Sequence, residues 1–144
     1  MKLGAVNHVA ICVSDLACSM SFYRPILEFL GYENTESFPG IEIWESHSTG
    51  TAINLWQAKE EHRESRHYDY APGLHHLAFH AAARNEVDDF YQLLSEIGAE
   101  IVNEPAEYDY APGYYAVFFR DPDAIRIELA HIPALSNAQS LQLA

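Results

Sequence analysis

Among the side chains of this 144-residue chain that could bind a divalent metal, we single out His8, His76 and Glu128. Two imidazoles and one carboxylate form a ligand set that suits zinc, nickel, iron, manganese or cobalt. A single histidine on a strand is more often a surface residue, and the chain has eight histidines. What favours a metal site is that these three residues, together with Asn54, occupy equivalent places in an internal duplication.

The duplication is visible in four landmarks that recur in the same order. They are His-Val-Ala-Ile at 8–11 and His-Leu-Ala-Phe at 76–79, Phe-Tyr at 22–23 and 90–91, Gly at 31 and 98, and Ile-Asn-Leu at 53–55 against Ile-Glu-Leu at 127–129. The spacing is 68 residues for the first two pairs, 67 for the third and 74 for the last. Such small drifts are expected where loops differ in length, so the chain contains two copies of one unit.

Each copy has the pattern of a strand, a helix and three further strands. Apolar residues alternate in the expected strands and recur at helical spacing in the expected helices. Ser14-Asp15 can cap the start of the first helix, and a glycine ends each helix. We expect strands at 5–13, 32–38, 41–46, 50–57, 74–81, 99–103, 114–119 and 125–131, and helices over about 16–30 and 85–97. The fold class is therefore α+β, with two tandem βαβββ modules at about 4–57 and 73–131 in a single domain, 1–144.

Strand alternation places the four polar positions of the duplication on the same side of their sheets, away from the helices. Side chains of a strand point to opposite faces in turn, and the apolar set is expected to pack under the helix. His8, Asn54, His76 and Glu128 then lie on the face away from the helices, as does His80. His75 has the parity of the apolar face.

The chain also contains a second, shorter repeat, because Tyr-Asp-Tyr-Ala-Pro-Gly occurs at 68–73 and again at 108–113. Its spacing of 40 residues does not match the module repeat. Each copy is turn chemistry that leads into a strand. The two copies are either similar loops or tyrosine-rich flaps over a pocket, since loops often carry binding residues.

Composition and charge exclude several classes of partner. Eight basic residues against 21 acidic ones give a net charge of −13, which argues against nucleic acid and anionic membranes. Cys12 and Cys18 do not form a disulfide framework, and neither a signal peptide nor a membrane span is visible. We expect a cytoplasmic protein whose partner is a small-molecule substrate.

Five segments of the chain together carry a family resemblance. They are Asn-His-Val-Ala-Ile at 7–11, Asp-Leu at 15–16, Phe-Tyr-Arg at 22–24, Gly-Leu-His-His-Leu-Ala-Phe at 73–79 and Phe-Arg-Asp-Pro-Asp-Ala-Ile-Arg-Ile-Glu-Leu at 119–129. The chain resembles the glyoxalase/bleomycin resistance/extradiol dioxygenase group, the vicinal oxygen chelate superfamily, over all but about its last dozen residues. The resemblance implies a cupped, partly open mixed-sheet barrel with the helices outside, one divalent metal ion and a homodimer.

Carried over residue by residue, the resemblance puts metal ligands at His8, His76 and Glu128. A fourth family position falls on Asn54, which is a short and neutral donor, and Ala124 stands where the family usually has glycine. The resemblance implies a metal-dependent enzyme of lyase or isomerase type, whose substrate chelates the metal through vicinal oxygens. Glu128 is the expected catalytic base, because Asn54 cannot take a proton.

Two other functions remain open at this point. Three protein ligands with vacant positions also suit a ring-cleaving dioxygenase, and some relatives bind drugs without any metal. Thiol transfer of the fosfomycin type is less favoured, because Arg126 is the only clear cation on the expected site face. The residues expected to contact the substrate are Asn54, Trp56, His80, Tyr115 and Arg126, with Tyr114 as the alternative to Tyr115.

Overall fold

The computed structural model describes residues 3–140 of the chain. The chain divides into two compact units, Met1–Arg66 and His67–Ala144, and each is described here by itself. The boundary falls between the two modules that the sequence predicts. Within the described residues, none of the helices is long and apolar enough to cross a membrane.

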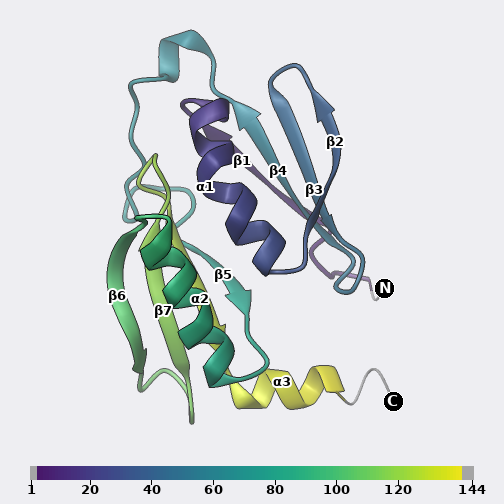
Figure 1. Cartoon of the computed structure of the whole chain (residues 1–144), viewed down its shortest axis with the longest axis vertical. Coiled ribbons are helices and arrows are strands. Elements are labelled where there is room, and N and C mark those ends of the chain that lie inside the picture. The colour runs from purple at the N-terminus through teal and green to yellow at the C-terminus, as the bar shows by residue number, and fades with distance from the viewer. Residues whose placement is uncertain (1–2, 141–144) are drawn as a thin grey trace. The chain divides into compact units, whose positions relative to one another are not determined.

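The first unit contains a helix and a four-stranded sheet (Figure 1). Its elements are β1 (His8–Val13), α1 (Leu16–Phe29), β2 (Glu33–Phe38), β3 (Ile41–Ser46), β4 (Thr51–Gln57) and the short 3-10 helix η1 (Glu60–His62). The strand order is β1-β4-β3-β2, with β1 parallel to β4 and the other pairs antiparallel.

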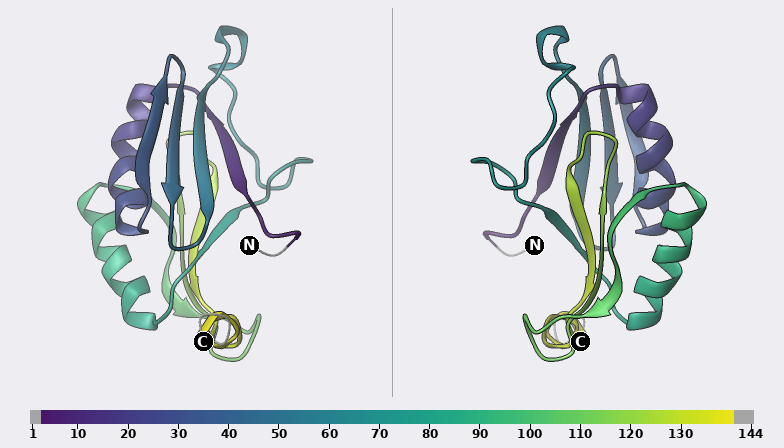
Figure 2. Two further views of the ribbon diagram at one scale, coloured as in Figure 1. Left: turned by 90° about the vertical axis from the view of Figure 1, so that its right-hand side faces the viewer. Right: turned by 90° about the vertical axis from the view of Figure 1, so that its left-hand side faces the viewer.

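The second unit repeats this arrangement. Its elements are β5 (Leu77–His80), α2 (Arg84–Glu96), β6 (Glu100–Glu107), β7 (Tyr115–Arg120), β8 (Arg126–His131) and the added helix α3 (Pro133–Ser140). The strand order is β5-β8-β7-β6, and β5 runs parallel to β8. In each unit the long helix covers one face of its own sheet (Figure 2).

Local sequence signals explain where the two long helices begin and which faces they bury. The Asp15 side chain accepts a hydrogen bond from the Cys18 backbone N–H at 3.0 Å, as an N-cap residue does. At the start of α2 the Glu86 carboxylate accepts from the Ala82 backbone N–H at 2.6 Å. The buried residues of α2 follow helical spacing and are Val87, Phe90 and Leu94. Each buried side chain of this size stabilises the fold by roughly 1.5–3 kcal/mol.

The strand register of the two units confirms the duplication. Asn54 pairs with Ala10 in the first sheet, and Glu128 pairs with Ala78 in the second. In both sheets the equivalent residues 54 and 128 therefore pair with the residue two positions after a predicted histidine ligand. The tandem βαβββ organisation and the α+β class are as the sequence predicts. Each sheet is an open ladder of four strands, and neither closes on itself; the partly open barrel stays a prediction.

The turn that joins β7 to β8 holds the site strand β8 in register. The Asp121 carboxylate accepts hydrogen bonds from the backbone N–H groups of Asp123 at 2.9 Å and Ile125 at 2.8 Å. Ala124 has a φ of 68°, and it is the one non-glycine residue with positive φ among the described residues. This backbone conformation favours glycine, so an alanine at this position is strained.

Candidate active site of the second unit

A pocket of about 390 Å³ opens on the second sheet and is lined by Tyr70, His75, His76, Tyr110, Tyr114, Phe118, Arg126 and Glu128. Its floor is formed by β7 and β8, where Phe118 and Glu128 are cross-strand partners. Strand alternation puts these two residues on the face opposite Val117 and Phe119, which are fully buried in the core. The site face predicted for Glu128 is therefore a pocket wall.

Glu128 is the centre of this pocket. The residue is only 1% exposed, and its Oε2 lies 3.2 Å from Nε2 of His76. Its other oxygen, Oε1, accepts a hydrogen bond from the hydroxyl group of Tyr114. A buried carboxylate needs such partners, because an unpaired charge is costly away from water. The sheet thus holds one acidic group, oriented from both sides, at the base of a small pocket.

His76 is held by a second histidine. Nδ1 of His76 lies 2.7 Å from Nδ1 of His75, so that one ring donates a hydrogen bond and the other accepts it. The ring of His76 also makes an edge contact with Phe118 at a centroid distance of 6.4 Å. Because Nδ1 is engaged with His75, Nε2 is the nitrogen that faces Glu128. This leaves the ring oriented as a metal-ligating histidine usually is.

Arg126 supplies the positive charge of the pocket. Its guanidinium carbon lies 4.7 Å above the ring of Phe118, a cation–π contact. Its Nε is buried and has no hydrogen-bond partner among the described residues. Asp69 lies 3.9 Å away but receives two short hydrogen bonds from Arg120, at 2.9 and 2.8 Å. These hydrogen bonds hold the pKa of the Asp69 carboxyl below its ordinary value, so Asp69 stays ionised.

The pocket also fixes the protonation state of Tyr114. Burial of the phenol and, after it, the hydrogen bond to Glu128 raise the pKa of Tyr114 well above its ordinary value. An ionised phenol beside a carboxylate would repel it, so Tyr114 keeps its proton at neutral pH. The residue therefore acts only as a hydrogen-bond donor toward Glu128.

Three of the predicted site residues belong to the first unit, and they lie on the expected face of its sheet. His8 is exposed, and its Nδ1 lies 2.7 Å from the side-chain oxygen of Asn7. Asn54 is half-buried, and its side-chain oxygen has no hydrogen-bond partner among the described residues. Trp56 is 46% exposed on the same strand.

Two predicted substrate contacts of the second unit lie outside this pocket. The hydroxyl of Tyr115 donates to Asp88 of helix α2 at 2.7 Å, so Tyr115 faces the helix, whereas Tyr114 lines the pocket. Nε2 of His80 lies 3.3 Å from the hydroxyl oxygen of Ser136 on helix α3. Burial lowers the pKa of His80, and the neighbouring His131 lowers it further.

Four pocket residues were missing from the predicted contacts, namely Tyr70, Tyr110, His75 and Phe118. Strand alternation assigned His75 to the apolar face, but β5 begins only at Leu77, so the alternation does not extend to His75. Tyr70 and Tyr110 are the third residues of the two Tyr-Asp-Tyr-Ala-Pro-Gly copies. Both reach one pocket, which favours the interpretation of the copies as flaps.

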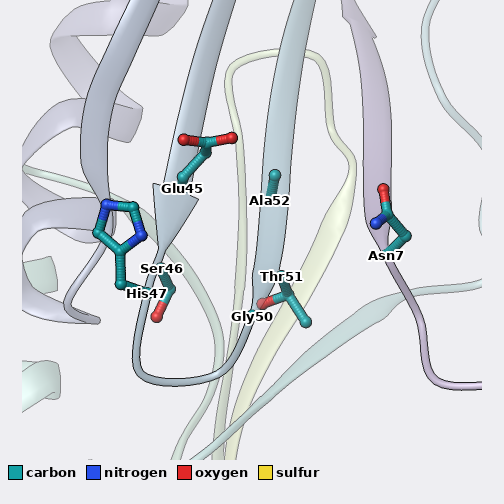
Figure 3. Close-up of a pocket in the computed structure, with 7 residues that line it drawn as sticks. All are labelled: Asn7, Glu45, Ser46, His47, Gly50, Thr51 and Ala52. Carbon is teal, nitrogen blue, oxygen red and sulfur yellow. The ribbon is translucent and has the colours of Figure 1, made fainter. Parts of the chain in front are cut away.

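A second pocket, of about 250 Å³, lies in the first unit at the β3–β4 turn (Figure 3). Its lining residues are Asn7, Glu45, Ser46, His47, Gly50, Thr51 and Ala52. It has no aromatic wall, and neither His8 nor Asn54 lines it. Of the two pockets, the one in the second unit is therefore the one that contains site residues predicted from the sequence.

The donor set of the second-unit pocket fits one half of a metal site. Two ligand atoms bound to one ion at about 2.1 Å, at an angle between about 90° and 109°, lie about 3.0–3.4 Å apart. Nε2 of His76 and Oε2 of Glu128 are 3.2 Å apart. Among residues 3–140, no three histidine, cysteine, aspartate or glutamate side chains are grouped to hold a metal ion. The pair thus offers two donors, and the third predicted ligand, His8, belongs to the other unit.

Comparison with known proteins places this chain in a family. The model of the Glyoxalase/Bleomycin resistance protein/Dioxygenase superfamily matches residues 5–129. The chain therefore belongs to this superfamily, as the five motif segments predict. It is a family that includes enzymes, as the metallothiol transferase described next illustrates.

Individual relatives resemble the chain over most of its length. Uncharacterized protein YqjT of Bacillus subtilis is 33% identical over 125 residues, which cover 86% of this chain and 96% of YqjT. Metallothiol transferase FosB of Staphylococcus saprophyticus is 28% identical over 127 residues, which cover 87% of this chain and 75% of FosB. A solved structure from Bacillus halodurans, provisionally described as a glyoxalase, has a TM-score of 0.81 at 33% identity and covers 90% and 97% of the two chains.

Proposed function

We propose that this chain is a metal-dependent enzyme of lyase or isomerase type that acts on a small substrate with two vicinal oxygens. The observation that carries the proposal is the contact between His76 Nε2 and Glu128 Oε2 at 3.2 Å. A nitrogen and a carboxylate oxygen at this distance are spaced as two ligands of one divalent ion. The pocket beside them is large enough for a small molecule.

The proposed ligand set is His8, His76 and Glu128. Imidazole and carboxylate donors suit zinc, nickel, iron, manganese and cobalt, so the donor types leave the choice among these metals open. The hydrogen bonds of His75 to His76 and of Tyr114 to Glu128 support the proposal, because ligating side chains are usually oriented by a further set of partners. Asn54 takes the fourth family position as a neutral contact to the substrate.

When bound, a divalent ion in this site would polarise the two substrate oxygens as a Lewis acid. Glu128 would take the proton from the substrate carbon next to the polarised group and return it to the neighbouring carbon. Tyr114 keeps the carboxylate in place and holds its own proton throughout. Arg126 would orient a negatively charged part of the substrate.

One specific observation favours a second candidate, a metal-free small-molecule binding protein. His76 and Tyr114 already satisfy both oxygens of Glu128, so the pocket is electrostatically complete without an ion. A ring-cleaving dioxygenase is a variant of the first candidate, with dioxygen at a vacant metal position. Thiol transfer, the activity in the name of the FosB relatives, has less support, because Arg126 is the only lysine or arginine among the lining residues of this pocket.

Elemental analysis of the purified protein tests the proposal. We expect about one divalent ion per chain in the wild type, and its loss in His76→Ala and in His8→Ala. His62→Ala is the matched control, because His62 is exposed on η1 and lines neither described pocket. Absence of metal in the wild type after reconstitution would overturn the enzyme proposal in favour of the metal-free binding protein.

Assembly as a homodimer in the cytoplasm belongs to the same proposal and rests on the family resemblance. Light scattering of the purified wild type, with and without added metal, tests the dimer directly.

A further inference from the structure

The two Tyr-Asp-Tyr-Ala-Pro-Gly copies place aromatic rings at the mouth of the second-unit pocket. Tyr70 is 87% exposed and Tyr110 is 71% exposed, although both residues line the pocket. Neighbouring rings support both tyrosines, and Tyr110 meets Tyr114 edge-on at 5.4 Å in addition to its contact with Tyr108. The ring of Tyr70 meets His75 edge-on at 4.8 Å, and that of Tyr110 stacks on Tyr108 at 5.5 Å with an angle of 2°.

The loops that carry both rings are anchored by hydrogen bonds to the rest of the unit. The loop of Tyr70 is anchored by its neighbour Asp69, whose carboxylate makes the two hydrogen bonds with Arg120. The loop of Tyr110 is closed by a backbone hydrogen bond from Tyr108 N–H to the Tyr114 carbonyl at 3.1 Å. A ligand therefore loses little free energy to the ordering of these loops.

The interior of the pocket offers a different chemistry from its mouth. Phe118 and Tyr114 form apolar walls, while Arg126 has a buried Nε without a hydrogen-bond partner among the described residues. The nearest carboxylate, that of Asp69, is already engaged by Arg120. Arg126 can therefore donate hydrogen bonds to an anionic oxygen of a ligand without losing a strong partner.

We propose that this pocket selects a substrate with one aromatic ring and an anionic oxygen group, the ring against Tyr70 and Tyr110 and the anion at Arg126. A cavity of about 150 Å³ is known to admit benzene, so the volume of about 390 Å³ accommodates one ring with its substituents. Offset and edge contacts between aromatic rings add to the gain from burial. This inference rests on the proposed function in one respect only, because it takes His76 and Glu128 as the groups at which the substrate reacts.

The probe for this inference is phenylglyoxylate, which combines a phenyl ring, a carboxylate and two vicinal oxygens. Two analogues separate its features. Cyclohexylglyoxylate keeps the charge and replaces the flat ring, whereas methyl phenylglyoxylate keeps the ring and removes the charge. We expect titration calorimetry to show that phenylglyoxylate binds most tightly, with each analogue weaker by at least about threefold.

Variants assign the two recognition elements. Tyr70→Ala and Tyr110→Ala are expected to weaken phenylglyoxylate binding about three- to tenfold each, while Tyr70→Phe and Tyr110→Phe retain it. Arg126→Gln is expected to weaken it about ten- to a hundredfold, with partial recovery in Arg126→Lys. Tyr68→Ala is the matched control, since Tyr68 is 73% exposed in the same loop but does not line the pocket. Circular dichroism checks the fold of each variant.

The inference is overturned if cyclohexylglyoxylate binds as tightly as phenylglyoxylate, if no probe binds, or if the Tyr70 and Tyr110 variants behave like Tyr68→Ala. Each titration is repeated on protein that has been dialysed against a chelator. Tyrosine-dependent binding by a wild-type protein that takes up no metal even after reconstitution would contradict the proposed enzyme but support this inference. A metal-containing protein that does not discriminate the three probes would contradict this inference alone.

Discussion

His76 and Glu128 meet diagonally across two parallel strands, with Nε2 and Oε2 3.2 Å apart. His76 lies two residues before Ala78, the strand partner of Glu128. His8 stands in the same relation to Asn54 in the first sheet, because it lies two residues before Ala10, the partner of Asn54. The two units thus share this strand register, and the first carries the amide of Asn54 where the second carries the carboxylate of Glu128. The carboxyl group proposed for acid–base chemistry is in the second unit.

The hydrogen bond from Tyr114 to Glu128 leads to the first prediction. Tyr114→Phe removes a donor to the proposed metal ligand while it keeps the ring. We expect metal affinity or catalytic activity to fall about 10- to 100-fold, as is typical when a partner of a ligand is lost. Metal titration monitored by calorimetry, and turnover once a substrate is known, check this result.

Tyr115→Phe is the matched control for this experiment. It also removes one hydroxyl that donates to a carboxylate, that of Asp88 at 2.7 Å, but this bond lies on the helix side of the sheet. We expect Tyr115→Phe to bind metal like the wild type. Equal loss in the two variants would show that Tyr114 acts on general stability rather than on Glu128.

The raised pKa of Tyr114 predicts sensitivity to alkaline pH. In the unfolded chain the phenol ionises near its ordinary pKa of about 10, whereas burial and Glu128 keep it protonated in the fold. Stability from this group is therefore complete below about pH 10 and is lost as the pH rises through the folded-state pKa. Urea unfolding between about pH 8 and pH 11 should show a smaller decline for Tyr114→Phe than for the wild type. Parallel pH profiles for the two proteins would contradict this assignment.

Periodicity made the duplication and the site face predictable from the sequence. Glu128 and Asn54 have the predicted facing because apolar residues alternate with them along buried strands, whereas His76 lies just before β5 and still lines the pocket. His75 was assigned to the wrong face, because alternation holds only within a strand and β5 begins two residues later. The choice between Tyr114 and Tyr115 needed the register of β7, in which Phe118 opposite Glu128 fixes which residues face the pocket.

Loop conformation carries no such periodicity, which limits what the sequence can tell about the mouth of the pocket. The repeated motif indicated that Tyr70 and Tyr110 are related, but the identical sequences alone did not show that both reach one pocket. The ion pair between Asp69 and Arg120 joins residues 51 positions apart, and nothing local in the sequence marks it. Such contacts depend on how the loop packs on the sheet.

That ion pair gives the third prediction. Asp69→Asn should lower the free energy of unfolding at neutral pH by about 2–3 kcal/mol, because it weakens two charge-assisted hydrogen bonds of a side chain that is 7% exposed. Arg120 lowers the pKa of Asp69, so this contribution is present above the ordinary value of 3.8 and is lost as the pH falls through the folded-state pKa. Urea unfolding of both proteins at neutral and acidic pH measures the difference.

Asp109→Asn is the control for the Asp69 variant, because Asp109 has the same place in the second motif copy but is exposed. We expect a change of less than about 0.5 kcal/mol at neutral pH, as for most surface substitutions. If the wild type and Asp69→Asn differ in free energy of unfolding by the same amount in strong acid as at neutral pH, the charge of the Asp69 carboxylate is not the source of the difference.

The last prediction concerns Ala124, whose φ of 68° is unusual for a residue with a side chain. Ala124→Gly relieves a backbone cost of about 1–2 kcal/mol, but it also loses a buried methyl group and gains entropy in the unfolded chain. Ala81→Gly suffers the same two losses without any relief, because Ala81 is similarly buried, 3% against 6% exposed, and has an ordinary φ. We therefore expect Ala124→Gly to be less destabilising than Ala81→Gly by about 1–2 kcal/mol in thermal or urea unfolding. Equal destabilisation of the two variants would mean that the β7–β8 turn bears no strain at Ala124, and that the absence of glycine there costs the protein nothing.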